Sequence, residues 1–414
     1  MSSSKAPKSN QNSWPNRIFK RLLNLSASAK ENTKSTEEQA VHRDCVGRRK
    51  SCSDKDDTID FLGKKRENSN WDLSTASTRM FVGTWNVSGR ATHDGLNLKD
   101  WLCTTTTTPA DIYVLGFQEI VALNAGNILV NKEKKPDSTG SWLSLIHNAL
   151  NEEASSSRGG SLYQLAGSKR MVGIFLCVWL RAEFIPHVSG LEVSSIARGI
   201  MGYVGNKGSI SMSMTLMGTS FCFVCVHLAA GNKERDEMKR NDDVTEILKK
   251  TKFDGEFPTP TRILDHDTVV FLGDLNYRLT NSTHRETVES LVSDENWETL
   301  LEKDQLRINH KAGRIFTGWE EGKISFPPTY KYQLDSHCYS SKSRCIPAWC
   351  DRILWTGDGI SQSAYNRSES TFSDHRPVNA VFNVKLRNKT EATIKAQSCR
   401  FEKHDNNNKI FQET

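Results

Sequence analysis

Polar side chains end several apolar segments of this 414-residue chain. Asn86 ends FVGTWN, Glu119 ends VLGFQE and His227 ends FVCVH, while Asp274 and Asn276 end VVFLGDLN. An unpaired buried polar group costs free energy, so its repetition at the ends of apolar runs needs a common cause. Strand ends that meet at one rim of a sheet would bring these groups into a single site.

Asp374 and His375, which open DHRPV after a loop, extend this set. Each side chain alone has an ordinary structural explanation, since asparagines suit turns, a glutamate suits a helix N-terminus and a buried histidine can be a satisfied core residue. Together they offer oxygen ligands without a neighbouring Cys–His cluster, which favours the hard cation Mg²⁺ over zinc. Asp351, in PAWCDRILW, is the carboxylate expected to keep His375 protonated and oriented.

Hydrolysis of a phosphate ester is the reaction that this set supports. A cation bound by Glu119 would neutralise phosphate oxygens and help the alkoxide to leave. Asp274 would position and deprotonate a water, and Asn276 would hold the geometry. His227 and His375 would donate hydrogen bonds to the equatorial phosphate oxygens, where charge develops.

A second set consists of basic residues in segments rich in Gly, Pro, Tyr and Ser, which predicts that they lie on loops. Several cations around one metal site indicate a substrate with several phosphates. Each of them alone is explained equally well as solvated surface. The set comprises Arg198, Lys207, Lys331, Lys342, Arg344 and Arg352.

The elements that must position these residues begin near Met80. Short apolar runs rich in β-branched and aromatic residues predict strands up to about residue 388. Two segments, 234–253 and 284–308, have a helical pattern. Strands mixed with helices in one long domain predict an α/β or α+β layered fold around a buried sheet core.

The two ends of the chain differ in composition from this domain. Residues 1–78 and 389–414 are predicted to lack a packed core. Residues 1–70 contain 15 Lys+Arg and 9 Asp+Glu, a surplus equal to the whole net charge of +6, so the remainder does not resemble a nucleic-acid binder. Within this tail, 13–26 is a short amphipathic helix candidate with a basic side. It would attach weakly to anionic lipid, although a helix docked on the domain or an unstructured arm explains the pattern as well.

Seven motifs, in one order from about Phe81 to Leu386, resemble the inositol polyphosphate 5-phosphatase family. The most specific are VVFLGDLNYRL (269–279) and PAWCDRILW (347–355), and the others are GTWNVSG, GFQEIV, GYVGNKGS, FPPTYKY and SDHRPV. HLAAGNKERDEMKRNDDVTEIL and SWPNRIFKRLLNL resemble the plant type I branch. The resemblance implies a DNase I-like four-layer α/β sandwich over residues 79–388, with two central β-sheets flanked by helices.

The resemblance also implies Mg²⁺ as cofactor and roles for individual residues. Its substrates would be phosphoinositide lipids and soluble inositol phosphates, with peripheral membrane contact and no nucleic acid. Positions that match the family's metal site are Glu119 and Asn86, with Asp374 close by. Positions that match its catalytic residues are Asp274, Asn276, His227, His375 and Asp351. Positions that match the segment contacting a 4-phosphate are Tyr330, Lys331, Lys342 and Arg344, and those near a 1-phosphate are Asn206 and Lys207.

Two alternatives remain at this stage. Another phosphodiesterase or a nuclease on the same fold would share the Asn, Glu, DxN and SDH elements, but it would not need FPPTYKY or SKSRCIPAWCDRIL. A catalytically weak phosphoinositide-binding scaffold would have degenerate metal or base positions, whereas each expected position is filled. No secretory signal precedes the domain, so we expect a cytoplasmic address with peripheral membrane association, or a nuclear one.

Overall fold

The computed structural model describes residues 78–102, 108–121, 138–152, 162–198, 207–255, 259–280, 283–341 and 346–387. The amphipathic segment 13–26 and the predicted C-terminal tail lie outside these ranges. So do three of the expected substrate-binding residues, Asn206, Lys342 and Arg344. Of the predicted N-terminal tail, only Thr78 lies within the described ranges.

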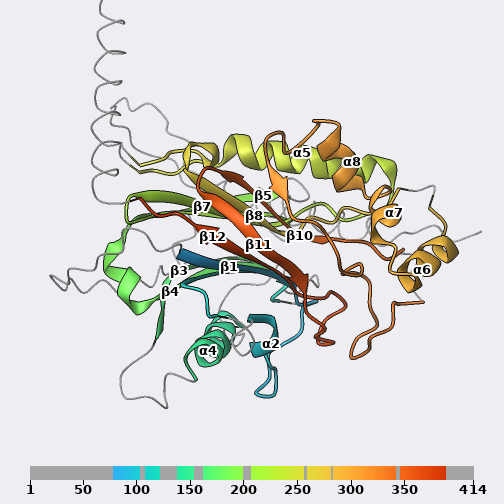
Figure 1. Cartoon of the computed structure of the whole chain (residues 1–414), viewed down its shortest axis with the longest axis horizontal. Helices are drawn as coiled ribbons and strands as arrows, with labels where there is room; N and C mark the ends of the chain where they lie inside the picture. The colour runs from blue at the N-terminus through green and yellow to red at the C-terminus, as the bar shows by residue number, and fades with distance from the viewer. Residues whose placement is uncertain are drawn as a thin grey trace, which may run out of the picture. The chain divides into compact units, whose positions relative to one another are not determined.

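Two six-stranded sheets pack face to face, and helices cover their outer faces (Figure 1). The first sheet has the order β11-β12-β1-β2-β4-β3, in which only β1 and β2 are parallel neighbours. Its strands are β1 (Thr78–Asn86), β2 (Ile112–Gln118), β3 (Tyr163–Met171), β4 (Ile174–Arg181), β11 (Ile360–Arg367) and β12 (Val378–Val384).

The second sheet has the order β5-β6-β7-β8-β10-β9, in which only β7 and β8 are parallel neighbours. Because parallel strands end at the same edge, each sheet presents two carboxyl ends side by side. Its strands are β5 (Val188–Arg198), β6 (Lys207–Leu216), β7 (Thr219–His227), β8 (Thr268–Asp274), β9 (Glu320–Glu321) and β10 (Asp351–Gly357).

Helices α2 (Lys99–Leu102) and α4 (Ser138–Asn151) cover the first sheet, and α5 (Glu234–Lys250) and α8 (Gln305–Lys311) cover the second (Figure 1). Their apolar sides pack on the outward side chains of the strands. This arrangement confirms the predicted DNase I-like sandwich. No helix in the described ranges has the length and apolar character needed to cross a membrane.

The helix predicted over 234–253 is confirmed, but the pattern over 284–308 belongs to three helices. They are α6 (Arg285–Ser293), α7 (Trp297–Leu301) and α8. Asn296 and Asp304 break the run, because their side chains accept hydrogen bonds from the backbone N–H groups of Thr299 and Arg307 and so begin new helices. Short 3₁₀ turns at Ala182–His187 and Ile263–Asp265 complete the helical elements of the described ranges.

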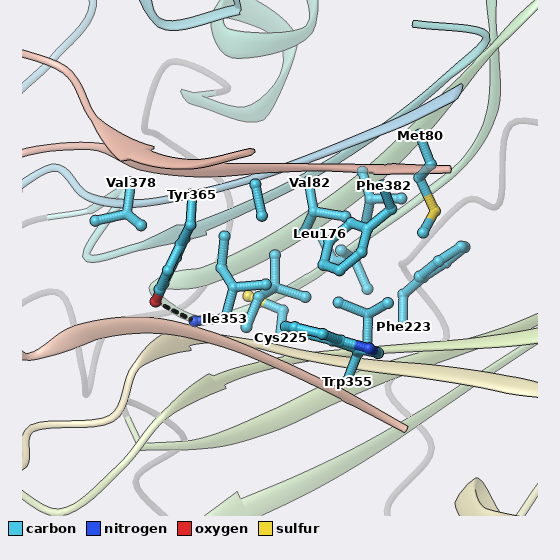
Figure 2. Close-up of a cluster of buried hydrophobic side chains, with 14 of the residues drawn as sticks. Met80, Val82, Leu176, Phe223, Cys225, Ile353, Trp355, Tyr365, Val378 and Phe382 are labelled. Atoms are coloured by element: carbon cyan, nitrogen blue, oxygen red, sulfur yellow. Dashed lines mark hydrogen bonds between the residues drawn. The ribbon is translucent and has the colours of Figure 1, made fainter. Parts of the chain in front are cut away.

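The apolar core lies between the two sheets (Figure 2). Met80, Val82 and Leu176 from the first sheet meet Phe223 and Trp355 from the second, as the alternation of side chains along strands requires. This burial fixes which face of each strand points inward. The polar groups at the strand ends are therefore held at the rim of a rigid, close-packed layer.

Candidate active site

The ends of the parallel strand pairs meet across the two sheets. Asn86 ends β1, and His227 and Asp274 end the neighbouring strands β7 and β8 in register. The side-chain amide Nδ2 of Asn86 donates a hydrogen bond of 2.9 Å to Oδ2 of Asp274, which joins one sheet to the other. The convergence expected from the sequence is thus present.

Asp274 lies at the centre of the cluster and is buried. Its Oδ2 is 3.1 Å from Nε2 of His227, and its Oδ1 accepts a 3.0 Å hydrogen bond from the backbone N–H of Asn276. Burial alone would raise the pKa of this carboxyl group, but His227, His375 and Lys207 together hold that pKa well below its usual range. Asp274 is therefore ionised at neutral pH, as a proton acceptor must be.

Asn276 adopts a left-handed backbone conformation, with φ +57°, immediately after the strand. Its Nδ2 donates to the carbonyl oxygen of Leu228 at 3.2 Å, and its Oδ1 accepts from the guanidinium of Arg278 at 2.6 Å. Because asparagine tolerates positive φ better than most residues, the turn can place its N–H on Asp274. Asn276 therefore fixes the orientation of the carboxylate.

His375 and Asp351 form a buried pair beside this centre. Nδ1 of His375 lies 2.9 Å from Oδ2 of Asp351, and the same oxygen accepts a 2.7 Å hydrogen bond from the hydroxyl of Thr329. Burial opposes the charge on the histidine, but Asp351 outweighs it and raises the pKa of His375 to about 9. His375 is thus protonated at neutral pH, and its Nε2 lies 4.0 Å from Asp274.

Glu119 is the more open carboxylate of the cluster, with 27% of its side chain exposed. It directly follows β2 at φ +55°, which turns it toward the site, and its Oε1 accepts from Nδ2 of Asn86 at 3.3 Å. Lys207 places its amine beside Nε2 of His227. Burial lowers the pKa of Lys207 to about 8, while Asp274 and Glu119 act in the opposite direction. The space beside these carboxylates therefore favours a positive charge.

A divalent cation fits the space beside Glu119 better than it fits a second candidate metal site nearby. Asp274, Asp351 and His375 also offer ligand atoms within 4.8 Å of one another. However, Nδ1 of His375 and Oδ2 of Asp351 lie 2.9 Å apart and bond to each other, and the hydroxyl of Thr329 binds the same oxygen, so these two atoms are already engaged within the protein. Glu119 and the adjoining oxygens of the strand ends are the remaining donors, and carboxylate and amide oxygens suit Mg²⁺.

Tyr330 and Lys331 also reach the site. The ring of Tyr330 packs on that of His375, with centroids 4.4 Å apart, and the amine of Lys331 lies 2.9 Å from Oδ2 of Asp374. Burial opposes the charge of Asp374, but His375 and Lys331 lower the pKa of its carboxyl group. Asp374, expected close to the metal residues, therefore lies beside His375 and Lys331, and one of its oxygens is paired with the lysine.

Comparison with known proteins agrees with the phosphate-hydrolysing centre that this geometry indicates. Residues 83–381 match the family model described as Endonuclease/Exonuclease/phosphatase family 2. The type I inositol polyphosphate 5-phosphatase 8 of Arabidopsis thaliana is 45% identical over 94% of this chain and 89% of its own length. The chain belongs to the inositol polyphosphate 5-phosphatase family. It is therefore a hydrolase of phosphate monoesters, which decides against a nuclease, an enzyme that cleaves phosphodiesters, and against an inactive scaffold.

Two further relatives support this membership of the 5-phosphatases. The type IV inositol polyphosphate 5-phosphatase 9 of the same plant is 45% identical over 74% of this chain and 78% of its own length. The solved 5-phosphatase domain of SPsynaptojanin, in complex with inositol (1,4)-bisphosphate and calcium ion, is 28% identical with a TM-score of 0.66. That alignment covers 81% of this chain and 93% of the solved domain.

Three basic residues of this 5-phosphatase differ from the prediction that they lie on loops. Arg352 is the second residue of β10 and is buried, with its guanidinium bonded to Asp304 at 2.9 Å and to Glu321 at 2.6 Å. Its assignment to substrate binding is wrong, because both sides of its fork are occupied by carboxylates. Arg198 ends β5, and Lys207 begins β6 at the catalytic centre rather than on a peripheral loop.

Arg198 is held by the helix above the second sheet. Its Nε lies 2.7 Å from Oδ1 of Asp243 in α5, while the other oxygen of Asp243 accepts from the backbone N–H of Ala229 at 3.1 Å. Ala229 follows the strand that ends in His227. The arginine thus supports the loop after β7, and the structure gives it two carboxylate partners, Asp243 and Glu246.

Arg278 is a member of the site that the sequence interpretation missed. Its guanidinium carbon lies 4.5 Å from the ring centre of Tyr330, and its Nε and Nη2 donate to Asn276. The clue was available in VVFLGDLNYRL, where a basic residue stands two positions after Asn276. A buried cation next to the base adds positive potential where a phosphate would bind.

Proposed function

We propose that this chain uses Mg²⁺ to remove the 5-phosphate from phosphoinositides such as PtdIns(4,5)P₂ and PtdIns(3,4,5)P₃, and from soluble Ins(1,4,5)P₃ and Ins(1,3,4,5)P₄. The observation that supports it most directly is the hydrogen bond from Asn86 to Asp274, which unites the polar strand ends of both sheets in one centre. Membership of the 5-phosphatase family is the reason for proposing a substrate with an inositol ring and removal of its 5-phosphate.

In this mechanism Asp274 accepts a proton from the attacking water. Asn276 keeps the carboxylate oriented, so that the lone pair of the water points at phosphorus. The Nε2–H of protonated His375 donates to a phosphate oxygen, and His227 donates to another. Mg²⁺ held by Glu119 and Asn86 would neutralise the phosphate and the leaving alkoxide.

Burial and then Lys207 lower the pKa of His227, so this histidine is neutral at pH 7. It can therefore donate only one hydrogen bond while its partner His375 supplies a full positive charge. Two histidines with opposite protonation give the phosphate one neutral and one charged donor. This division suits a transition state in which negative charge is spread over the equatorial oxygens.

Lys331 and Tyr330 are proposed to contact the 4-phosphate, together with Lys342 and Arg344. A cation built to pair with that group is left unpaired when the group is missing, so substrates without it should react poorly. The basic N-terminal tail is proposed to add peripheral membrane attachment, consistent with a cytoplasmic or nuclear address.

A product assay tests this proposal. Purified protein is incubated with PtdIns(4,5)P₂ vesicles, PtdIns5P vesicles, Ins(1,4,5)P₃ and Ins(1,4)P₂, with Mg²⁺ or with EDTA, and the products are separated by chromatography. The expected result is loss of the 5-phosphate from the two 4,5-phosphorylated substrates, dependence on Mg²⁺, and little turnover of the other two. Release of a 4-phosphate, or full activity in EDTA, would contradict the proposal.

A further inference from the structure

The segment 327–332 places three side chains at the catalytic centre although it lies in no regular helix or strand. The hydroxyl of Thr329 binds Asp351, the ring of Tyr330 packs on His375, and the amine of Lys331 pairs with Asp374. Instead of a strand ladder, its backbone makes isolated bridges at Tyr330 and Tyr332 and single hydrogen bonds to Asp374, Ser340 and Arg376. Something other than a ladder of strand hydrogen bonds must hold these side chains in place.

Arg367, the last residue of β11, binds this segment from the first sheet. Its Nη1 donates to the carbonyl oxygens of Pro327 at 3.2 Å and Pro328 at 2.9 Å, and to the hydroxyl of Tyr332 at 2.5 Å. Only 7% of the arginine side chain is exposed. Arg367 shares the carbonyl oxygen of Pro328 with the hydroxyls of Tyr332, at 3.1 Å, and Tyr339, at 2.8 Å, and it adds a charged donor to a segment in which two prolines lack an N–H.

Arg376 binds the same segment from the other side. Its backbone N–H donates to the carbonyl oxygen of Thr329 at 2.9 Å, and its guanidinium carbon lies 3.8 Å above the ring of Tyr332. The guanidinium also donates to Ser336 at 2.5 Å. The ring of Tyr339 also stacks on that of Tyr332, with the two centroids 4.3 Å apart.

We propose that Arg367 and Arg376 are positioning residues that hold segment 327–332, so that Thr329, Tyr330 and Lys331 face the reacting groups. The two arginines touch neither the reacting atoms nor the proposed phosphate contacts, and they act through the segment. This inference rests on the proposed function for its kinetic consequence, but the ordering of the segment can be measured separately. Arg367 is the better residue to change, because Arg376 adjoins His375 directly.

The test compares Arg367→Met with a matched control, Arg387→Met. Arg387 also forms a part-buried bidentate pair, in which its two Nη atoms each lie 2.5 Å from an oxygen of Asp267. Asp267 precedes β8 and Arg387 follows β12. The expected result is a loss of kcat/KM of at least about tenfold on Ins(1,4,5)P₃ in Arg367→Met, because small misplacements of contacting groups are costly. Arg387→Met should keep kcat/KM within about twofold at a comparable loss of Tm, and Arg367→Lys should restore part of the activity.

Hydrogen exchange separates failure of this inference from failure of the proposed function. Amides in the peptide covering 327–332 should exchange faster in Arg367→Met than in the Arg387→Met control. If exchange and kcat/KM of Arg367→Met both equal those of the control, the arginine is an ordinary stabilising residue and the inference is wrong. Faster exchange in Arg367→Met than in Arg387→Met, in a protein whose wild type shows no 5-phosphatase activity, would instead retain the positioning role and reject the proposed substrate.

Discussion

Replacing Asp351 by asparagine should remove a charge while keeping the size and the hydrogen bond to Thr329. In the wild-type protein, Asp351 overcomes the effect of burial and moves the pKa of His375 from 6.5 to about 9. That difference corresponds to about 3 kcal/mol in favour of the protonated ring. Without the negative charge of Asp351, only Asp274 and Asp374 oppose the effect of burial, so the pKa of His375 should fall back toward 6.5.

The sign of the pH effect follows from which form is active. The protonated ring donates to phosphate, so wild-type activity should stay high in neutral solution and fall as the pH rises through about 9. At pH 7.5 a ring with a pKa of 6.5 is only about one-tenth protonated. Asp351→Asn should therefore lose at least about tenfold in kcat/KM at pH 7.5 from protonation alone, and recover part of that loss near pH 6.

The assay is a profile of kcat/KM against pH for Ins(1,4,5)P₃ at saturating Mg²⁺. Asp267→Asn, which alters a paired carboxylate at the opposite ends of the strands, serves as the control for general destabilisation. A wild-type profile in Asp351→Asn would refute the assigned charge effect. A uniform loss at every pH would show that Asp351 only orients the ring.

Three further predictions concern other parts of the chain. Asp274→Ala should lower kcat at least about 10²-fold, the low end for a removed general base, and near-normal turnover would exclude it as the base. Burial lowers the pKa of His266 in the folded protein. Below about pH 6.5 this histidine is therefore protonated more fully in the unfolded chain than in the folded one. The contribution of His266 to the urea-derived free energy of unfolding should fall between pH 7 and pH 5 by at most about 1.4 kcal/mol per pH unit, so the wild-type protein should lose more stability over that range than His266→Gln; equal losses would contradict this. Deleting residues 1–70 should weaken binding to anionic liposomes without changing kcat on soluble Ins(1,4,5)P₃, and unchanged binding would remove the membrane role of the tail.

The strand ends could be predicted from the sequence because apolar runs and the polar residues that stop them are local features. β1 and β8 were recognisable in this way, and Asn86 and Asp274 then had to meet once the sheets packed. The order of the seven motifs along the chain indicated the fold class. These parts of the structure depend on short-range patterns that a single sequence contains.

The partners of buried charges could not be predicted, because they come from distant segments. Arg352 stands next to Asp351, but its own carboxylates are 48 and 31 residues away, at Asp304 and Glu321. Lys207 begins a strand whose first residue reaches the centre, although the glycines around it favour a loop. The break at Asn296 does have a local signal, because asparagine is a capping residue and here stands inside a helical pattern.

The central claim is that the polar strand ends of both sheets form one cation-binding hydrolytic centre. Its most direct test is a binding titration of Mn²⁺, as a paramagnetic substitute for Mg²⁺, followed by electron paramagnetic resonance. Glu246→Gln, on the outer helix α5, is the control carboxylate. We predict that the wild-type and control proteins bind the ion equally, while Glu119→Gln binds it at least about tenfold more weakly. Equal affinity in all three proteins would contradict the claim.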